Sequence, residues 1–176
     1  MKKNLKLPKT RYVAYVASSV DGRISLGGKG KPDWTSSDDW KFFQGELTKF
    51  EAFVAGRNTF EAVETRLSRR NTFVLSSRVK EINNRGKVSF VNPKTVNLRK
   101  LFGQYENVAV LGGATAYQTM LDENLIDEIY VTVEPLIFGR GREMFVGGSK
   151  NTRLQLLSSR KLNRQGTILL HYQVLR

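Results

Sequence analysis

The 176-residue sequence contains no cysteine and a single histidine, His171. The absence of cysteine excludes disulfide frameworks, thiol catalysis and cysteine-ligated metals. A single histidine near the C-terminus argues against a multi-histidine metal site, and against a Ser-His-Asp triad built elsewhere in the chain. We therefore expect no bound metal, and we expect His171 to be structural or exposed.

The sequence also lacks long hydrophobic runs: no apolar stretch reaches 18 residues, and no secretory segment stands near the start. Its hydrophobic content of 40% is that of a globular protein with a real core. We predict one domain over residues 1–176, in the cytoplasm and without membrane contact. Residues 1–10 are predicted to be a basic, weakly ordered arm.

Negative charge is scarce, because 29 Lys and Arg outweigh 16 Asp and Glu and give a net charge of +13. A basic nucleic-acid-binding domain is therefore one alternative. The positive residues are dispersed along the sequence, however, and we recognise no nucleic-acid-binding motif. A basic field also attracts small phosphorylated ligands, which is the interpretation that the motifs below favour.

Strand and helix patterns alternate along the chain. Strands are predicted at residues 11–19, 23–25, 53–56, 72–75, 88–91, 108–111, 129–133, 154–158 and 168–174. Helices are predicted at residues 36–50, 60–67, 98–105 and 114–121, with a loop at 27–33 and a turn at 163–166. This order predicts an α/β fold, with a central, mostly parallel, mixed sheet flanked by helices and ending in a C-terminal antiparallel hairpin.

The most informative segment is residues 53–60, where an apolar strand ends at Gly56 and is followed at once by Arg57, Asn58 and Thr59. A strand that passes into a helix in this way directs the unpaired N–H groups of the helix, together with a guanidinium, at one place. That place suits a phosphate. The alternative is an ordinary helix start capped by Asn58 or Thr59, with a solvated arginine.

Two further predicted strands also end in residues that could bind a phosphate. Ser76, Ser77 and Arg78 offer two hydroxyls and a cation, although a serine-rich turn would look the same. Gly112 and Gly113 precede a helix and would let the backbone approach a pyrophosphate, although they do not form G-x-G-x-x-G. Because ligands collect at the carboxyl edge of such sheets, the three ends together suggest a dinucleotide with an extra phosphate, recognised by Arg57 and Arg78.

Asp39 is the best candidate for an ionisable catalytic group. It lies in the first turn of a predicted helix beside Trp40 and Phe43, where burial would raise its pKa. The alternative is a helix-capping acid, since Ser36 and Asp39 have capping-box spacing. Asp21, before Gly22, is expected to form a turn rather than to catalyse.

The order of these motifs resembles the dihydrofolate reductase superfamily, and within it the reductase domain of riboflavin biosynthesis. The match runs along nearly the whole chain after the basic arm. The resemblance rests on the segments Ala17 to Ile24, Trp34 to Phe43, Gly56 to Glu61, Leu75 to Arg78, Leu111 to Tyr117 and Leu125 to Gly139.

The resemblance implies NADPH as cofactor, Asp39 in the place of the acid that contacts the substrate, and a homodimer. It implies a pocket lined on its apolar side by Trp34, Phe43 and Leu47. The cofactor residues that it implies are Ala17, Ile24, Gly56, Arg57, Asn58, Thr59, Ser76, Ser77, Arg78, Leu111, Gly112, Gly113, Ala114, Thr115 and Tyr117.

The expected activity is therefore an NADPH-dependent reduction of a C=N or C=O bond in a small heterocycle or an opened-ring sugar amine. A more specific alternative is the 5-amino-6-(5-phosphoribosylamino)uracil reductase of riboflavin biosynthesis. Residues 60–67 lack the Asp-Asp-Pro-x-Leu-Thr stretch usual in those enzymes, so the substrate stays open.

Overall fold

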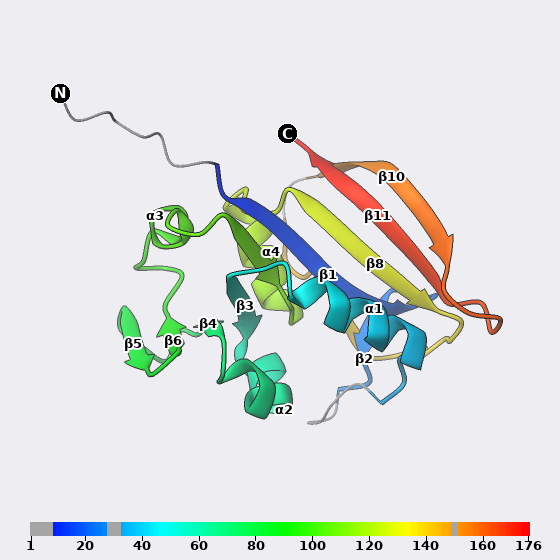
Figure 1. The fold of residues 1–176 in the computed structure, drawn as a ribbon, viewed down its shortest axis with the longest axis horizontal. Helices are drawn as coiled ribbons and strands as arrows, with labels where there is room; N and C mark the ends of the chain where they lie inside the picture. The colour runs from blue at the N-terminus through cyan, green and yellow to red at the C-terminus, as the bar shows by residue number, and fades with distance from the viewer. Residues whose placement is uncertain (1–8, 28–32, 149–150) are drawn as a thin grey trace.

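The computed structural model describes residues 9–27, 33–148 and 151–176 (Figure 1). Most of the predicted basic arm, residues 1–8, and the centre of the predicted loop, residues 28–32, lie outside these ranges. None of the helices formed by the described residues is long and apolar enough to cross a membrane.

The predicted alternation of strands and helices is present. The strands are β1 (Arg11–Ser19), β2 (Arg23–Ser25), β3 (Ala52–Gly56), β4 (Asn71–Leu75), β5 (Ile82–Arg85), β6 (Val88–Val91), β7 (Asn107–Val110), β8 (Glu128–Glu134), β9 (Arg142–Glu143), β10 (Arg153–Lys161) and β11 (Ile168–Leu175). The helices are α1 (Ser37–Leu47), α2 (Arg57–Leu67), α3 (Leu98–Phe102) and α4 (Ala114–Asp122).

Across the described residues, nine strands form one sheet in the order β10-β11-β8-β1-β7-β3-β4-β6-β5. The six strands from β8 to β6 run parallel, whereas β11 pairs antiparallel with β8, and β10 with β11. The sheet and its C-terminal hairpin confirm the predicted fold class.

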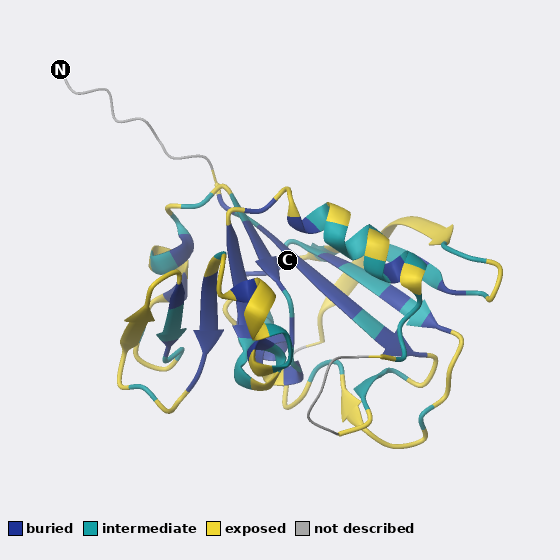
Figure 2. Cartoon of the chain, turned by 60° about the horizontal axis from the view of Figure 1, so that its bottom comes forward, coloured by how far each residue is buried: buried dark blue, intermediate teal, exposed yellow. Residues whose placement is uncertain are grey.

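Apolar side chains alternate between the two faces of the sheet, so each face carries its own core. Val54, Val108 and Val110 pack on the face that α4 covers, together with Tyr117 and Met120. On the opposite face, one cluster lies under α1 and a second, around Phe60 and Leu67, lies under α2. The central strands are accordingly the most buried part of the sheet (Figure 2).

The order of the strands determines where a ligand site can form. From β3 the chain crosses through α2 to β4 on one side, whereas from β7 it crosses through α4 to β8 on the other. Because β3 and β7 are neighbours, their connections diverge and leave a crevice at their carboxyl ends. Gly56 and Gly112, two residues singled out in the sequence, border this crevice.

Some predicted elements had the wrong extent. The strand β5 was not predicted, because its residues Ile-Asn-Asn-Arg are polar and exposed at the edge of the sheet, where only pairing with β6 makes them a strand. Helix α3 ends at Phe102 rather than at Tyr105, with Gly103 as its C-cap. Helix α2 begins at Arg57, three residues earlier than predicted, and has a kink at Val63.

Candidate active site

A cleft of about 2040 Å³ runs along the carboxyl edge of the sheet, bordered by α1, α2 and the start of α4. It exceeds the roughly 300–1,000 Å³ of an ordinary small-molecule pocket and is large enough for two ligands side by side. Every site residue named from the sequence lines this cleft: Ala17, Ile24, Trp34, Asp39, Phe43, Leu47, Gly56, Arg57, Asn58, Thr59, Ser76, Ser77, Arg78, Leu111, Gly112, Gly113, Ala114, Thr115 and Tyr117.

Two helices begin at the cleft without a side-chain cap. The N-caps of α2 and α4 are Gly56 and Gly113, and neither has a side chain to bond the free N–H groups of its helix. By contrast, α1 and α3 are capped by the side chains of Ser36 and Asn97. The two uncapped helix starts leave N–H groups and positive helix ends available to an anion.

The alternative in which Thr59 caps α2 is wrong. Its hydroxyl instead accepts a hydrogen bond from the Gly113 N–H at 2.8 Å, which ties the start of α2 to the start of α4. The two loops also meet directly, since the Gly56 N–H donates to the Gly112 carbonyl at 2.6 Å. The two strand ends therefore form one cradle rather than two separate turns.

The turn at Gly112 depends on the absence of a side chain. Its φ is +109°, and a Cβ there would lie 2.7 Å from the hydroxyl of Tyr117. The Tyr117 side chain is buried, and its hydroxyl donates to the backbone carbonyl of Tyr15. Tyr117 therefore packs against the turn at Gly112 and also lines the cleft.

Arg57 and Ser76 meet as the sequence predicts. Arg57 Nη2 donates to Ser76 Oγ at 2.9 Å, and the same hydroxyl accepts from the Arg78 backbone N–H at 3.2 Å. The Arg57 side chain is held by Ser76 and by Glu61, 3.8 Å away, yet it stays partly exposed to the cleft. The Arg57 guanidinium and the Ser76 hydroxyl thus lie together beside the start of α2.

Asp39 is buried, at 8% exposure, and faces the end of β8. Burial raises the pKa of its carboxyl group, a hydrogen bond with Thr132 lowers it, and the charge of Glu134 raises it further. The capping alternative for its side chain is not supported, since the Ser36 N–H donates to Glu134 Oε1 at 2.7 Å. Ser36 does cap the helix, through its Oγ and the Asp39 N–H.

The predicted apolar residues line the same cleft as Asp39. Trp34 packs edge-on against Phe138, and Phe43 packs against Tyr15 and Trp40. Leu47 is 5% exposed and belongs to the core under α1. Their core contacts hold these side chains in fixed positions at the wall of the cleft.

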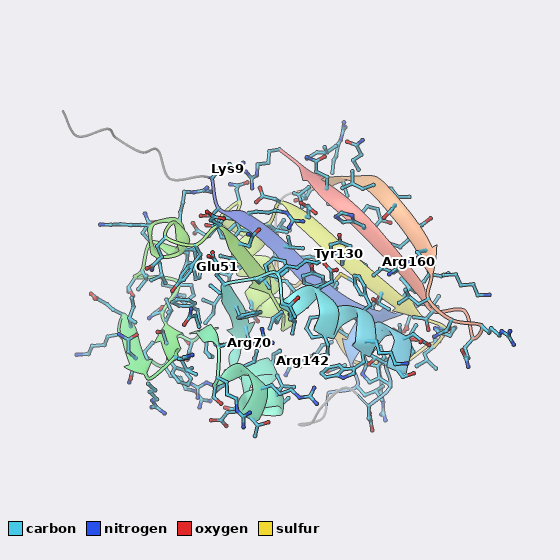
Figure 3. All side chains as sticks on the ribbon, in the orientation of Figure 1. Lys9, Glu51, Arg70, Tyr130, Arg142 and Arg160 are labelled. Atoms are coloured by element: carbon cyan, nitrogen blue, oxygen red, sulfur yellow. The ribbon has the colours of Figure 1, made fainter. Side chains whose placement is uncertain are left out.

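Sequence reasoning missed several residues that line the same cleft: Arg66, Arg69, Arg70, Tyr130, Thr132 and Arg142 (Arg70, Tyr130 and Arg142 are labelled in Figure 3). Arg70 Nη1 donates to the Leu47 carbonyl at 3.2 Å, and the Arg66 guanidinium lies 4.4 Å from the Trp40 ring centre. The clustering of arginines at residues 66–70 was the available signal.

Two other polar residues have structural contacts. His171 Nε2 lies 2.7 Å from Glu128 Oε2, and its ring stacks on Tyr130 at 3.9 Å, which agrees with the predicted structural role. Asp21 forms the predicted turn and also accepts from the backbone N–H groups of Phe138 and Gly139. Within the described ranges, no group of three or more His, Asp or Glu side chains is arranged to hold a metal ion.

The fold and the cleft at its carboxyl edge are of the dihydrofolate reductase type, and the sequence comparison agrees. The pattern of the dihydrofolate reductase family matches residues 13–139. The chain therefore belongs to the dihydrofolate reductase family. A curated relative, the uncharacterized protein YyaP of Bacillus subtilis, is 24% identical over 180 residues, covering 91% of this chain and 92% of YyaP.

Solved structures share the fold. A putative riboflavin biosynthesis protein from Shewanella has a TM-score of 0.74 at 22% identity, covering 95% of this chain and all of that one. Dihydrofolate reductase from Enterococcus faecalis, solved with NADP(H) and the compound RAB-propyl, has a TM-score of 0.69 at 23% identity, covering 96% and 99%. Both the dihydrofolate and the riboflavin branches of the predicted superfamily are thus among the relatives of this fold.

Proposed function

We propose that this protein is an NADPH-dependent reductase that transfers hydride to a C=N or C=O bond of a small heterocycle or opened-ring sugar amine. The observation that carries the proposal is the pair of uncapped helix starts at Gly56 and Gly113, joined into one cradle beside Arg57 and Ser76. Such a cradle suits a pyrophosphate, and the adjacent guanidinium suits a further phosphate.

The residues present fit this cofactor. The N–H groups of α2 and α4 would hold the pyrophosphate, and Arg57, Ser76, Ser77 and Arg78 would hold a 2′-phosphate. The glycine at 112 is required for the approach, because any side chain there would collide with Tyr117. When bound, NADPH supplies the hydride for the reduction.

Asp39 has the environment of a proton donor. Its raised pKa keeps more of the carboxyl group protonated near neutral pH than a solvated aspartate would be. The Thr132 hydroxyl orients the carboxyl, while Trp34 and Phe43 limit the access of water on the apolar side. Asp39 would polarise the substrate and help to protonate the atom next to the reduced carbon.

One observation favours the more specific alternative, a pyrimidine reductase acting on a phosphorylated ribosylamino substrate. Arg66, Arg69 and Arg70 line the end of the cleft near Leu47, where they would suit an anionic group of the substrate. Turnover of 5-amino-6-(5-phosphoribosylamino)uracil with NADPH would establish this alternative. Oxidation of NADPH by dihydrofolate or small carbonyl compounds, without turnover of the uracil, would exclude it.

Isothermal titration with NADPH and NADH tests the cofactor. We expect NADPH to bind at least tenfold more tightly than NADH, since one charge-assisted hydrogen bond contributes about 1.5 kcal/mol. Equal affinity for the two, or binding of neither, would contradict the proposal.

We also propose that two copies of the chain pair through the sheet face formed by Val131, Val133, Leu156, Ile168, Leu170 and Tyr172. Strand register puts these side chains on one face of β8, β11 and β10, and Leu156 is 51% exposed. The six side chains carry no charge, although the chain has a net charge of +13. The register also puts Lys161 of β10 opposite Ile168, at one end of this face. Two such basic chains can approach more closely through a face that is otherwise uncharged than through the rest of their surface.

A further inference from the structure

Glu134 is a buried acid that belongs to no recognisable sequence motif. It is the last residue of β8 and is 3% exposed. A buried carboxylate is costly unless its oxygens are hydrogen-bonded, and here both are. Its position at the carboxyl end of β8 puts it two residues beyond Thr132, on the same face of the strand as that partner of Asp39.

The two oxygens of Glu134 connect three elements. Oε1 accepts from the Ser36 backbone N–H at 2.7 Å, at the N-cap of α1. Oε2 accepts from the Thr167 hydroxyl at 2.6 Å, just before β11. In a capping box, an acid three residues into the helix would take the N–H of Ser36. Because Glu134 takes it instead, the Asp39 carboxyl is free to face the cleft.

We propose that Glu134 is a positioning residue for Asp39: it fixes the first turn of α1 against the end of β8 and places a negative charge beside the acid. This inference rests on the proposed function in one respect, the role of Asp39 as proton donor.

The surroundings support a direct effect of this charge. The groups that influence Asp39 are Thr132 and Glu134 of β8, in addition to its own burial. The other polar partners of Glu134 are neutral: the Ser36 N–H of α1 and the Thr167 hydroxyl before β11. Among the described residues, no cation forms an ion pair with either carboxyl group. The negative charge of Glu134 therefore opposes ionisation of Asp39 and raises its pKa.

The test compares native protein, Glu134→Gln and Thr167→Val by following the carboxyl carbon of Asp39 in an NMR titration. Glu134→Gln removes the charge, so we expect the Asp39 midpoint to fall. Thr167→Val removes the hydrogen bond that its hydroxyl donates to Glu134 and the one that it accepts from Asn163, but keeps the charge of Glu134, so we expect a midpoint close to that of the native protein. An unchanged Asp39 midpoint in a folded Glu134→Gln variant would overturn the proposal.

A measurement on native protein keeps the proposal testable if the glutamine variant does not fold. The N–H of an N-cap residue ordinarily exchanges rapidly with solvent, because it lies outside the helix ladder. We expect the Ser36 amide to be protected from hydrogen exchange by Glu134. A freely exchanging Ser36 amide would overturn the positioning half of the proposal.

Neither readout needs a substrate, so the inference and the proposed function can fail separately. If the Asp39 midpoint falls in Glu134→Gln but no substrate is ever reduced, the inference stands and the function fails. With an identified substrate, the alkaline limb of the kcat profile, where a proton-donating Asp39 loses its proton, should move to lower pH in Glu134→Gln, in step with the NMR midpoint.

Discussion

At the scale of single residues, the proposed preference for a phosphorylated cofactor rests on two arginines that come from different strand ends. Arg57 starts α2, and Arg78 follows β4, with Ser76 bonded to both. Both arginines line the cleft. We expect the charge of these two arginines to distinguish NADPH from NADH.

Replacing Arg57 and Arg78 together by alanine should weaken NADPH binding about 10- to 100-fold and leave NADH binding nearly unchanged. Titration calorimetry at fixed salt concentration measures both affinities. The matched control is Arg85→Ala, which removes a cation that packs over Phe90 and does not line the cleft. Equal losses for NADPH and NADH would show that the two arginines act on something other than the 2′-phosphate.

The buried carboxyl group of Asp39 should make the free energy of unfolding depend on pH. The folded-state pKa of Asp39 lies above its ordinary value of 3.8, so its protonated form stabilises the fold, and this stabilisation is lost as pH rises from near 3.8 through the raised pKa. Asp39→Asn has no charge to bury. The variant should therefore gain stability relative to native protein across that window and keep the advantage at neutral pH, as measured by denaturant unfolding.

Asp21 is a control for Asp39, because the pKa of its carboxyl group is shifted in the opposite direction. Hydrogen bonds from Ser19, Phe138 and Gly139 lower the pKa of its carboxyl to about 2. The stability that Asp21 contributes is present above its ordinary pKa and is lost as pH falls through about 2. Asp21→Asn should thus be the less stable protein at neutral pH. If both variants changed stability in the same direction, our account of the two acids would be wrong.

The residues of the cofactor site could be predicted from sequence because each follows a strand end, and strand ends in a parallel sheet meet at one edge. Glu134 could not, since its partners, Ser36 and Thr167, lie 98 and 33 residues away in sequence. The cluster of arginines at residues 66–70 was visible in the sequence, but the bond of Arg70 to the Leu47 carbonyl was not, because it depends on how α1 and α2 pack. Local patterns carry no information about such contacts.

At the scale of elements, the turn between β7 and α4 is the most constrained connection. Gly112 combines a positive φ with a side chain of Tyr117 packed where a Cβ would stand. Such a turn has to be built from glycine for two separate reasons, conformation and space.

Gly112→Ala should destabilise the protein by about 3 kcal/mol or more and reduce NADPH binding, because both the strain and the collision with Tyr117 disturb the cradle. Gly86→Ala separates the two causes: Gly86 also has positive φ, at +62°, but a Cβ there meets nothing within 4 Å. It should cost only about 1 kcal/mol and leave NADPH binding intact. Thermal unfolding and calorimetry distinguish these outcomes, and similar losses in both variants would show that the contact with Tyr117 is unimportant.

Elements with strong periodicity were predicted well, and those that depend on their neighbours were not. The strands β1, β3, β4, β6 and β7 are runs of apolar residues, buried on both faces, as parallel strands are. Strand β5 has no such run and exists because it pairs with β6 at the edge of the sheet. The two-residue β9 likewise exists only through its pairing with β2.

At the scale of the whole molecule, part of the positive charge gathers at the cleft. The cleft is lined by the cations Arg57, Arg66, Arg69, Arg70, Arg78, Lys94 and Arg142, and by the acids Asp33, Asp39 and Glu61. This excess of positive charge favours small anionic ligands over an extended polyanion, because the charge lies in a concave site. We expect NADPH affinity to fall with rising salt, and duplex DNA not to bind at physiological salt in a filter or anisotropy assay. Tight, steeply salt-dependent DNA binding without nucleotide binding would instead favour the nucleic-acid alternative.

The remaining question at this scale is what covers the sheet beyond α4. Helix α4 packs on β3 and β7, and in Figure 1 no described helix lies over β10 and β11. The face formed by Val131, Val133, Leu156, Ile168, Leu170 and Tyr172 is therefore left to a second copy in the proposed dimer. In an isologous pair the same face of both copies is buried, so one substitution in this face introduces two charges into the interface.

Leu156→Glu should convert the dimer into monomers, because it buries two like charges and removes two apolar contacts in one interface. Sedimentation velocity over a range of protein concentrations measures the change. Ile82→Glu is the matched control: Ile82 is 42% exposed on β5, at the opposite edge of the sheet, and its replacement should leave the dimer intact. A native protein that is monomeric at every concentration would refute the pairing. A dimer that survives Leu156→Glu would place the interface on another face, since an apolar sheet face cannot accommodate two unpaired carboxylates.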